Sequence, residues 1–171
     1  MDWGLKFRIA RDAAAGLAFM HHEGIVHRDI AARNILLGET YQAYIADLGM
    51  SRLFENPSDS EAGQQTKSTV GPVRWMAPEA LMERRYSTAT DAYSFGILLW
   101  EISSDGKLPY GDMSTVAEAA TAVLRQNARP AVLPSTPLEF SQLMTQLWRK
   151  DPSERPSMSE AFETLKILCS L

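Results

Sequence analysis

The polar segment from His27 to Asn34, with the sequence HRDIAARN, constrains the fold of this 171-residue chain more than any other feature. A second acidic segment begins at Asp47, thirteen residues after Asn34. Short apolar runs flank both segments, and such runs predict brief strands at 25–26, 35–37 and 44–46. The pattern therefore predicts two successive loops between short strands, the first with an acid and a carboxamide and the second with another acid.

Helical periodicity dominates the rest of the chain. Apolar residues recur at helical spacing over 5–23, and Gly24 fits the position just after the end of a helix. From Pro78 onward the chain is predicted to be helical, with a cap at Ser87 and a helix to about residue 103. The sequence therefore predicts a mainly α fold with short strands around the two acidic loops.

Three later segments carry the pattern of a capping box, and they begin at Thr115, Thr136 and Ser157. The second of them has Pro137 at the first helical position. Apolar stripes at 143–148 and 162–168 are typical of core-facing helix surfaces. The polar residues 55–70 predict a loop.

Composition excludes several classes of function. The net charge of −4 gives no general affinity for nucleic acid or for an anionic membrane. The single cysteine, Cys169, excludes an internal disulfide and suits a reducing compartment. The first residues carry no secretory pattern, and no apolar stretch is long enough to span a bilayer. We expect a cytoplasmic chain, or the cytoplasmic part of a membrane protein, with no membrane contact from this segment.

Six motifs occur in an order and at a spacing that together are specific. They are His27–Asn34, Asp47–Gly49, Ala77–Glu79, Asp91–Gly96, Leu108–Tyr110 and Asp151–Pro156. In these motifs the chain resembles the C-terminal lobe of a eukaryotic protein kinase, over residues 1–171 and with an activation segment at 47–79. The resemblance implies transfer of the γ-phosphate of ATP to a hydroxyl of a protein substrate, with Mg²⁺ as the metal.

The resemblance also implies the roles of the site residues. Asp29 is expected to accept the proton of the substrate hydroxyl, with Arg33 beside it in the catalytic site. Asn34 and Asp47 provide the hard oxygen ligands that Mg²⁺ prefers. These two residues, together with Leu36, are expected to form the ATP site on this lobe. Leu48 stands where the family usually has Phe, and it is still apolar.

Further residues are expected to regulate or support this site. Arg28 in the family pairs with a phosphorylated activation loop, and a phosphate binds arginine through charge-assisted hydrogen bonds. The candidate phosphate carriers here are Thr66, Ser68 and Thr69. Gly49 permits an unusual backbone angle after Asp47.

Four residues are expected to hold the lobe together rather than to take part in the chemistry. Glu79 and Arg155 resemble the family's structural ion pair between the activation segment and the late helices. Asp91 resembles the acid that braces the catalytic loop through backbone hydrogen bonds. His27 is expected to pack and to form hydrogen bonds within the site.

Two positions favour tyrosine as the acceptor. Ser/Thr kinases usually carry Lys where this chain has Ala31, and Thr where it has Pro72. The absence of tyrosine between Asp47 and Glu79 is a counter-argument. A Ser/Thr kinase of the tyrosine-kinase-like group is therefore the alternative.

The sequence contains no Gly-x-Gly-x-x-Gly segment that could cradle the phosphates of ATP. A working kinase needs this loop, and a strand lysine, in addition to the residues above. We therefore expect a C-lobe without its N-lobe, and little turnover by the 171 residues alone. A non-catalytic C-lobe docking fragment is the remaining hypothesis, although the presence of Asp29, Asn34 and Asp47 together argues against it.

Overall fold

The computed structural model describes residues 1–53 and 72–170, which form a mainly helical fold with a few short strands. The helices are α1 (Trp3–His22), α2 (Pro78–Glu83), α3 (Thr88–Ser103), α4 (Val116–Gln126), α5 (Leu138–Leu147) and α6 (Met158–Leu168). The strands are β1 (Ile25–Val26), β2 (Ile35–Leu37), β3 (Ala43–Ile45) and β4 (Arg52–Leu53). The predicted fold class is confirmed. The predicted loop at 55–70 lies outside the described residues.

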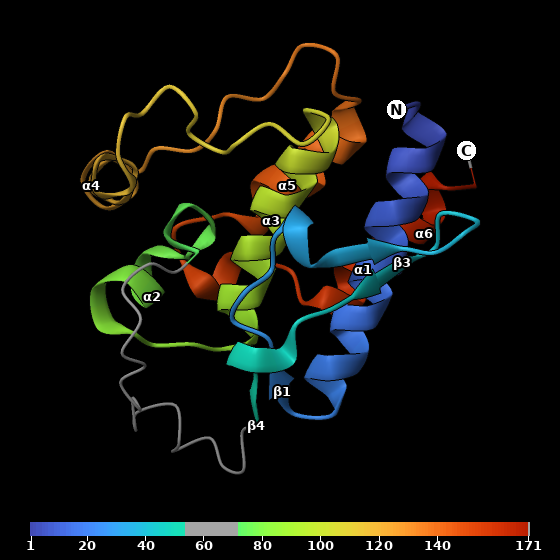
Figure 1. The fold of residues 1–171 in the computed structure, drawn as a ribbon, viewed down its shortest axis with the longest axis horizontal. Coiled ribbons are helices and arrows are strands. Elements are labelled where there is room, and N and C mark those ends of the chain that lie inside the picture. The colour runs from blue at the N-terminus through green and yellow to red at the C-terminus, as the bar shows by residue number, and fades with distance from the viewer. Residues whose placement is uncertain (54–71, 171) are drawn as a thin grey trace.

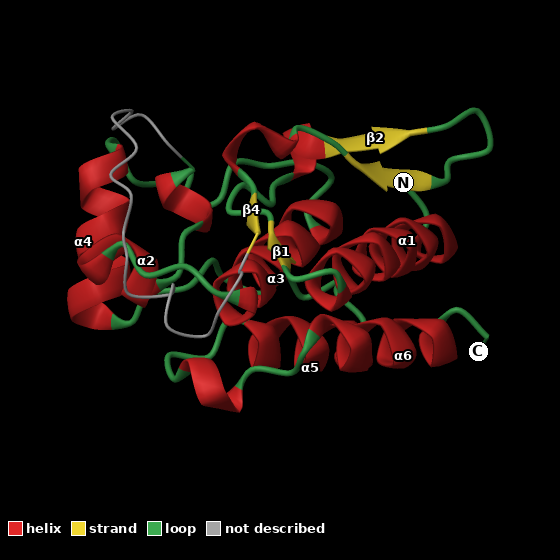
Figure 2. Cartoon of the chain, turned by 90° about the horizontal axis from the view of Figure 1, so that it is seen from below, coloured by secondary structure: helices red, strands yellow, loops and turns green. Residues whose placement is uncertain are grey.

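Helix α3 is the centre of the molecule (Figure 1). Helices α1 and α5 contact it directly, and α6 packs along α1. Figure 2 shows α5 and α6 below α1 and α3, with α2 and α4 gathered at the opposite end from the chain termini. Nearly every residue of α3 is buried, because other elements surround it, and a helix that is apolar all round needs such a position.

Two short antiparallel pairings flank the polar loops. Strands β2 and β3 form a hairpin in which Leu36 lies opposite Tyr44, and β3 packs on α1. Strands β1 and β4 pair Val26 with Arg52. The sequence did not predict β4, because a two-residue strand has no periodicity of its own. The β1–β4 pairing places the segment after Asp47 beside the segment before His27.

The ends of the helices test the capping predictions. The Ser157 hydroxyl accepts a hydrogen bond from the Glu160 amide at 3.3 Å, and the Glu160 carboxylate accepts one from the Ser157 amide. The capping box at Ser157 is therefore confirmed. Gly24 has a φ of +73° after α1, as expected. The prediction of a capping box at Thr136 was wrong. Helix α5 begins at Leu138 with Pro137 as its cap, because the Thr136 amide instead closes a turn onto the Leu133 carbonyl.

The other termini differ from expectation in smaller ways. Helix α1 begins at Trp3 because the Asp2 carboxylate caps it, accepting from the Leu5 amide at 2.9 Å. Thr115 caps α4 as predicted, but the Glu118 carboxylate accepts from the Ser114 amide and not from Thr115. These acceptors satisfy amides that have no partner within the helix.

The core forms where the apolar stripes predicted it, with one exception. Leu143, Met144, Leu147 and Trp148 of the first stripe are all buried. In the second stripe only Leu165 is fully buried, and Leu168 lies half-exposed near the end of α6. Within residues 1–53 and 72–170, no helix has both the length and the apolar character needed to cross a membrane.

Candidate active site

The carboxylate of Asp29 is held from two sides within its own loop. Arg33 pairs with Oδ1, and the side-chain amide of Asn34 donates to Oδ2 at 2.9 Å and to the Asp29 carbonyl at 2.7 Å. The short 3₁₀ turn Ala32–Asn34 brings these partners back toward Asp29. The residue is only 8% exposed. The loop therefore presents a carboxylate of fixed orientation, which is what a general base requires.

Asp91 of α3 anchors this loop through the backbone. Its Oδ2 accepts from the His27 amide at 2.8 Å, and its Oδ1 accepts from the Arg28 amide at 2.9 Å. Oδ2 also lies 2.9 Å from Nε2 of His21 on α1. Arg28 has a φ of +70°, which is unfavourable for a residue with a Cβ. The hydrogen bonds that these amides donate to Asp91 offset that strain and fix the loop to the central helix.

His27 and Asn34 join the two acidic loops. The His27 ring lies between the Asp29 amide, which is 3.2 Å from Nδ1, and the Ala46 carbonyl, 3.0 Å from Nε2. The Ala46 amide in turn donates to the Asn34 carbonyl at 2.9 Å. Since Ala46 immediately precedes Asp47, these contacts hold the two loops side by side.

The donor set on these loops fits a hard divalent cation. The side-chain nitrogen Nδ2 of Asn34 donates to Asp29. The side-chain oxygen of Asn34 is therefore the atom left to bind a metal. Asp47 is exposed, and among the described residues its Oδ1 accepts only from the Gly49 amide, at 3.1 Å. No cluster of three or more His, Cys, Asp or Glu occurs in the described part of the chain. Two oxygen-bearing residues suit Mg²⁺, which keeps several waters when it binds protein.

Gly49 was expected to provide an unusual backbone angle after Asp47, and this prediction was wrong. The left-handed residue of this turn is Asp47, with a φ of +62°, and Gly49 is not among the residues of positive φ. A Cβ at position 49 would lie 3.0 Å from Asp47 Oδ1. Gly49 therefore provides space for the carboxylate to receive its own amide hydrogen bond.

The Arg28 side chain packs on an aromatic ring. Its guanidinium sits over the Tyr86 ring, 4.9 Å from the centroid, and its Nε has no partner among the described residues. Burial lowers the pKa of Arg28, and the nearby Arg52 lowers it further. The predicted phosphate carriers, Thr66, Ser68 and Thr69, lie outside the described residues. Their pairing with Arg28 stays a prediction.

Glu79 and Arg155 form the ion pair that the resemblance implied. Arg155 Nη1 lies 2.6 Å from Glu79 Oε1, and Nη2 lies 3.0 Å from Oε2. The Arg155 side chain is fully buried and also donates to the carbonyls of Ala89, Arg149 and Lys150. One arginine thus joins α2, the start of α3 and the turn before α6.

Two residues that contact the loop of Asp29 were missed from the sequence. Glu101 of α3 accepts from the Ala32 amide at 2.9 Å, and Trp75 donates to the same oxygen of Glu101 at 2.8 Å. Leu36 is exposed on β2, and its contact with ATP stays a prediction. A buried glutamate in an apolar helix is a signal that could have identified Glu101, because such a carboxylate needs hydrogen-bond donors.

Comparison with known proteins places this geometry in a family. The family described as protein tyrosine and serine/threonine kinase matches residues 1–165. The serine/threonine-protein kinase STY46 of Arabidopsis thaliana is 36% identical over 160 residues, 94% of this chain and 26% of that protein. The tyrosine-protein kinase FRK of Homo sapiens is 38% identical over 160 residues, 92% of this chain and 30% of that protein.

The ephrin type-A receptor 3 of Danio rerio is 38% identical over 155 residues, which cover 91% of this chain and 15% of the receptor. The chain spans less than a third of the length of each of these relatives. The matches nevertheless cover almost all of its own residues, including both acidic loops and α3. The chain belongs to the protein tyrosine and serine/threonine kinase family.

Proposed function

We propose that residues 1–171 form the C-terminal lobe of a protein kinase domain and supply its catalytic base and its metal ligands. The observation that best supports this function is the carboxylate of Asp29, oriented by Arg33 and Asn34 in a loop that Asp91 anchors to α3. A fixed carboxylate beside two oxygen ligands for a cation is the arrangement that phosphoryl transfer needs from this lobe.

In this proposal the acceptor hydroxyl oxygen forms a bond to the γ-phosphorus of ATP. The bond from that phosphorus to the β–γ bridging oxygen breaks, ADP leaves, and the hydroxyl proton passes to Asp29. Asn34 and Asp47 would hold Mg²⁺, which when bound would neutralise charge on the phosphates. Leu36 contributes an exposed apolar surface to the nucleotide site.

We further propose tyrosine as the favoured acceptor. Pro72 is buried and caps the 3₁₀ turn Val73–Trp75, so in this proposal it supports the turn that would serve as a shelf for a long aromatic side chain. Arg33 lies over the Trp75 ring, 4.8 Å from the centroid, and so joins this shelf to Asp29. Relatives of both acceptor classes resemble the chain, so the alternative is a Ser/Thr kinase.

The test uses the protein at its native length, since the 171 residues contain no Gly-rich phosphate loop. Phosphate transfer from ATP to peptides that carry only Tyr, or only Ser and Thr, is measured for the wild type, for Asp29→Asn and for Asp112→Asn. Asp112 is an exposed acid far along the chain and serves as the matched control.

Transfer that Asp29→Asn reduces by roughly 10²-fold or more, and that Asp112→Asn leaves unchanged, is the expected result. Greater transfer to the Tyr peptide supports the proposed acceptor class, and the reverse preference establishes the alternative. Equal activity of Asp29→Asn and wild type would show that Asp29 is not the base.

A further inference from the structure

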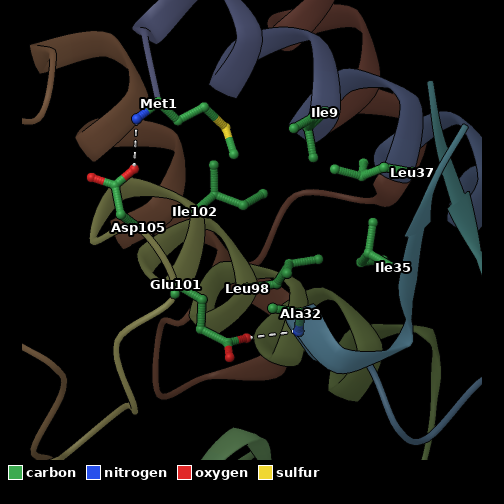
Figure 3. A pocket seen from close by; sticks show the side chains of 10 residues that line it. Met1, Ile9, Ala32, Ile35, Leu37, Leu98, Glu101, Ile102 and Asp105 are labelled. Carbon is green, nitrogen blue, oxygen red and sulfur yellow. Dashed lines mark hydrogen bonds and ion pairs between the residues drawn. The ribbon is translucent and has the colours of Figure 1, made fainter. Parts of the chain in front are cut away.

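Glu101 connects two segments that are far apart in the sequence. One oxygen of its carboxylate, Oε2, accepts both the Ala32 amide of the Asp29 loop and the indole Nε1–H of Trp75. Figure 3 shows the carboxylate of Glu101 directed at Ala32, where the loop passes over α3. A single oxygen therefore fixes the distance between the catalytic loop and the turn that carries Trp75.

The surroundings of Glu101 disfavour a charged carboxylate. It is 6% exposed, and it lines a cavity of about 400 Å³ whose other walls include Ile35, Leu98 and Ile102 (Figure 3). Burial raises the pKa of Glu101, while the hydrogen bonds from Trp75 and Ala32 and the charge of Arg33 act in the opposite direction. A buried carboxylate needs hydrogen-bond donors, and here the two donors come from two segments that Glu101 thereby connects.

Arg33 completes a path from Glu101 to the proposed catalytic base. Its guanidinium stacks on the Trp75 ring and pairs with Asp29 Oδ1. Its backbone follows directly after Ala32, whose amide Glu101 binds. Movement of Trp75 away from Glu101 would therefore remove the surface on which Arg33 rests.

We propose that Glu101 is a positioning residue that holds the acceptor-binding turn around Trp75 in register with the catalytic loop of Asp29. The inference rests on the proposed function, because it assigns the turn to the acceptor. Glu101 itself touches neither the acceptor nor the phosphate in this proposal. Its effect passes through Ala32 on one side and through Trp75 and Arg33 on the other.

The first experiment measures the contacts without activity. Hydrogen exchange of the Ala32 amide and the NMR resonance of the Trp75 indole N–H are followed in Glu101→Leu, Glu101→Gln and Trp75→Phe. Trp100→Phe is the matched control, because Trp100 lies on the same helix and its indole donates to the Ala131 carbonyl at 2.8 Å. It loses the same type of hydrogen bond without contact to the loop.

Glu101→Leu is expected to speed exchange at Ala32 by about tenfold or more, because the Ala32 amide loses a hydrogen bond to a charged group. It is also expected to shift the Trp75 resonance. Glu101→Gln keeps an acceptor oxygen and restores part of the protection. Trp75→Phe also speeds exchange at Ala32, whereas Trp100→Phe does not. Unchanged exchange at Ala32 in Trp75→Phe would overturn the coupling, whether or not the protein is a kinase.

The second experiment measures kinetics in the native-length protein. Glu101→Leu is expected to raise KM for the acceptor peptide and to lower kcat, with KM for ATP unchanged, and Glu101→Gln to recover part of both. A purely structural role would lower the amount of active protein and leave both KM values as they are, which would refute the positioning role. Absence of phosphate transfer by the wild type would instead refute the proposed function and leave the exchange result standing.

Discussion

Loss of the Glu79 charge should destabilise this lobe more than any surface change. In Glu79→Gln the Arg155 guanidinium keeps its three carbonyl partners but loses its only carboxylate among the described residues. The Arg155 side chain is 0% exposed, so water cannot replace the lost partner. The variant therefore leaves a buried cation without a counter-charge.

The expected cost follows from that burial. Removal of one partner of a buried ion pair costs about 3–5 kcal/mol, because the remaining charge stays desolvated. Domains of this kind are stable by about 5–15 kcal/mol, so the loss is a large fraction of the whole. At about 2–4 °C per kcal/mol for a chain of this size, the melting temperature should fall by roughly 6–20 °C.

The assay is equilibrium unfolding in urea, followed by tryptophan fluorescence and by far-UV circular dichroism. Coincident transitions from the two probes justify a two-state free energy. Glu163→Gln on α6 is the matched control, because Glu163 pairs with Lys166 and both side chains are more than half exposed. That variant should change the unfolding free energy by no more than about 0.5 kcal/mol.

A cost for Glu79→Gln as small as that of Glu163→Gln would refute the reasoning. It would mean that Arg155 is held by the carbonyls of Ala89, Arg149 and Lys150 and gains nothing from the carboxylate. Arg155→Lys separates the two contributions further. Lysine keeps the charge but loses the planar fork that reaches Glu79 and the carbonyls together, so it should also destabilise.

Four further variants test local features of the fold. Gly96→Ala should cost about 1–3 kcal/mol in thermal unfolding, because the new Cβ meets Leu147 Cβ at 3.1 Å. At Gly16 the same change places the new Cβ 3.4 Å from Ile45 Cδ1, an ordinary contact distance, and should not destabilise. Ser157→Ala should cost about 1 kcal/mol by loss of the α6 cap, and a melting temperature equal to wild type would contradict this. Burial raises the pKa of Glu101, so stability is lost as pH rises through that pKa. Glu101→Gln should therefore melt higher than wild type at neutral pH, by a margin that shrinks as the pH falls.

The sequence by itself determined the fold class and the local ends of several helices. The cap at Ser157 and the glycine after α1 were predictable because each depends on residues within one or two turns of the helix. The family, too, could be predicted from the order of its short motifs, and the match over residues 1–165 confirms it. Thr136 shows the limit of such local rules, since a competing turn took the amide that the pattern assigned to the helix.

The tertiary structure decided how the site is held. Asp91 reaches amides more than sixty residues earlier in the chain, and Glu101 binds both Ala32 and Trp75. The resemblance implied the role of Asp91, but no periodicity or spacing marks Glu101 as the partner of Ala32 and Trp75, because these residues meet only when α3 packs beneath the loops. The role of Gly49 was likewise visible only once the Asp47 carboxylate was placed in space. Local hydrogen bonds follow from neighbouring residues, whereas the orientation of Asp29 depends on contacts that exist only in the packed lobe.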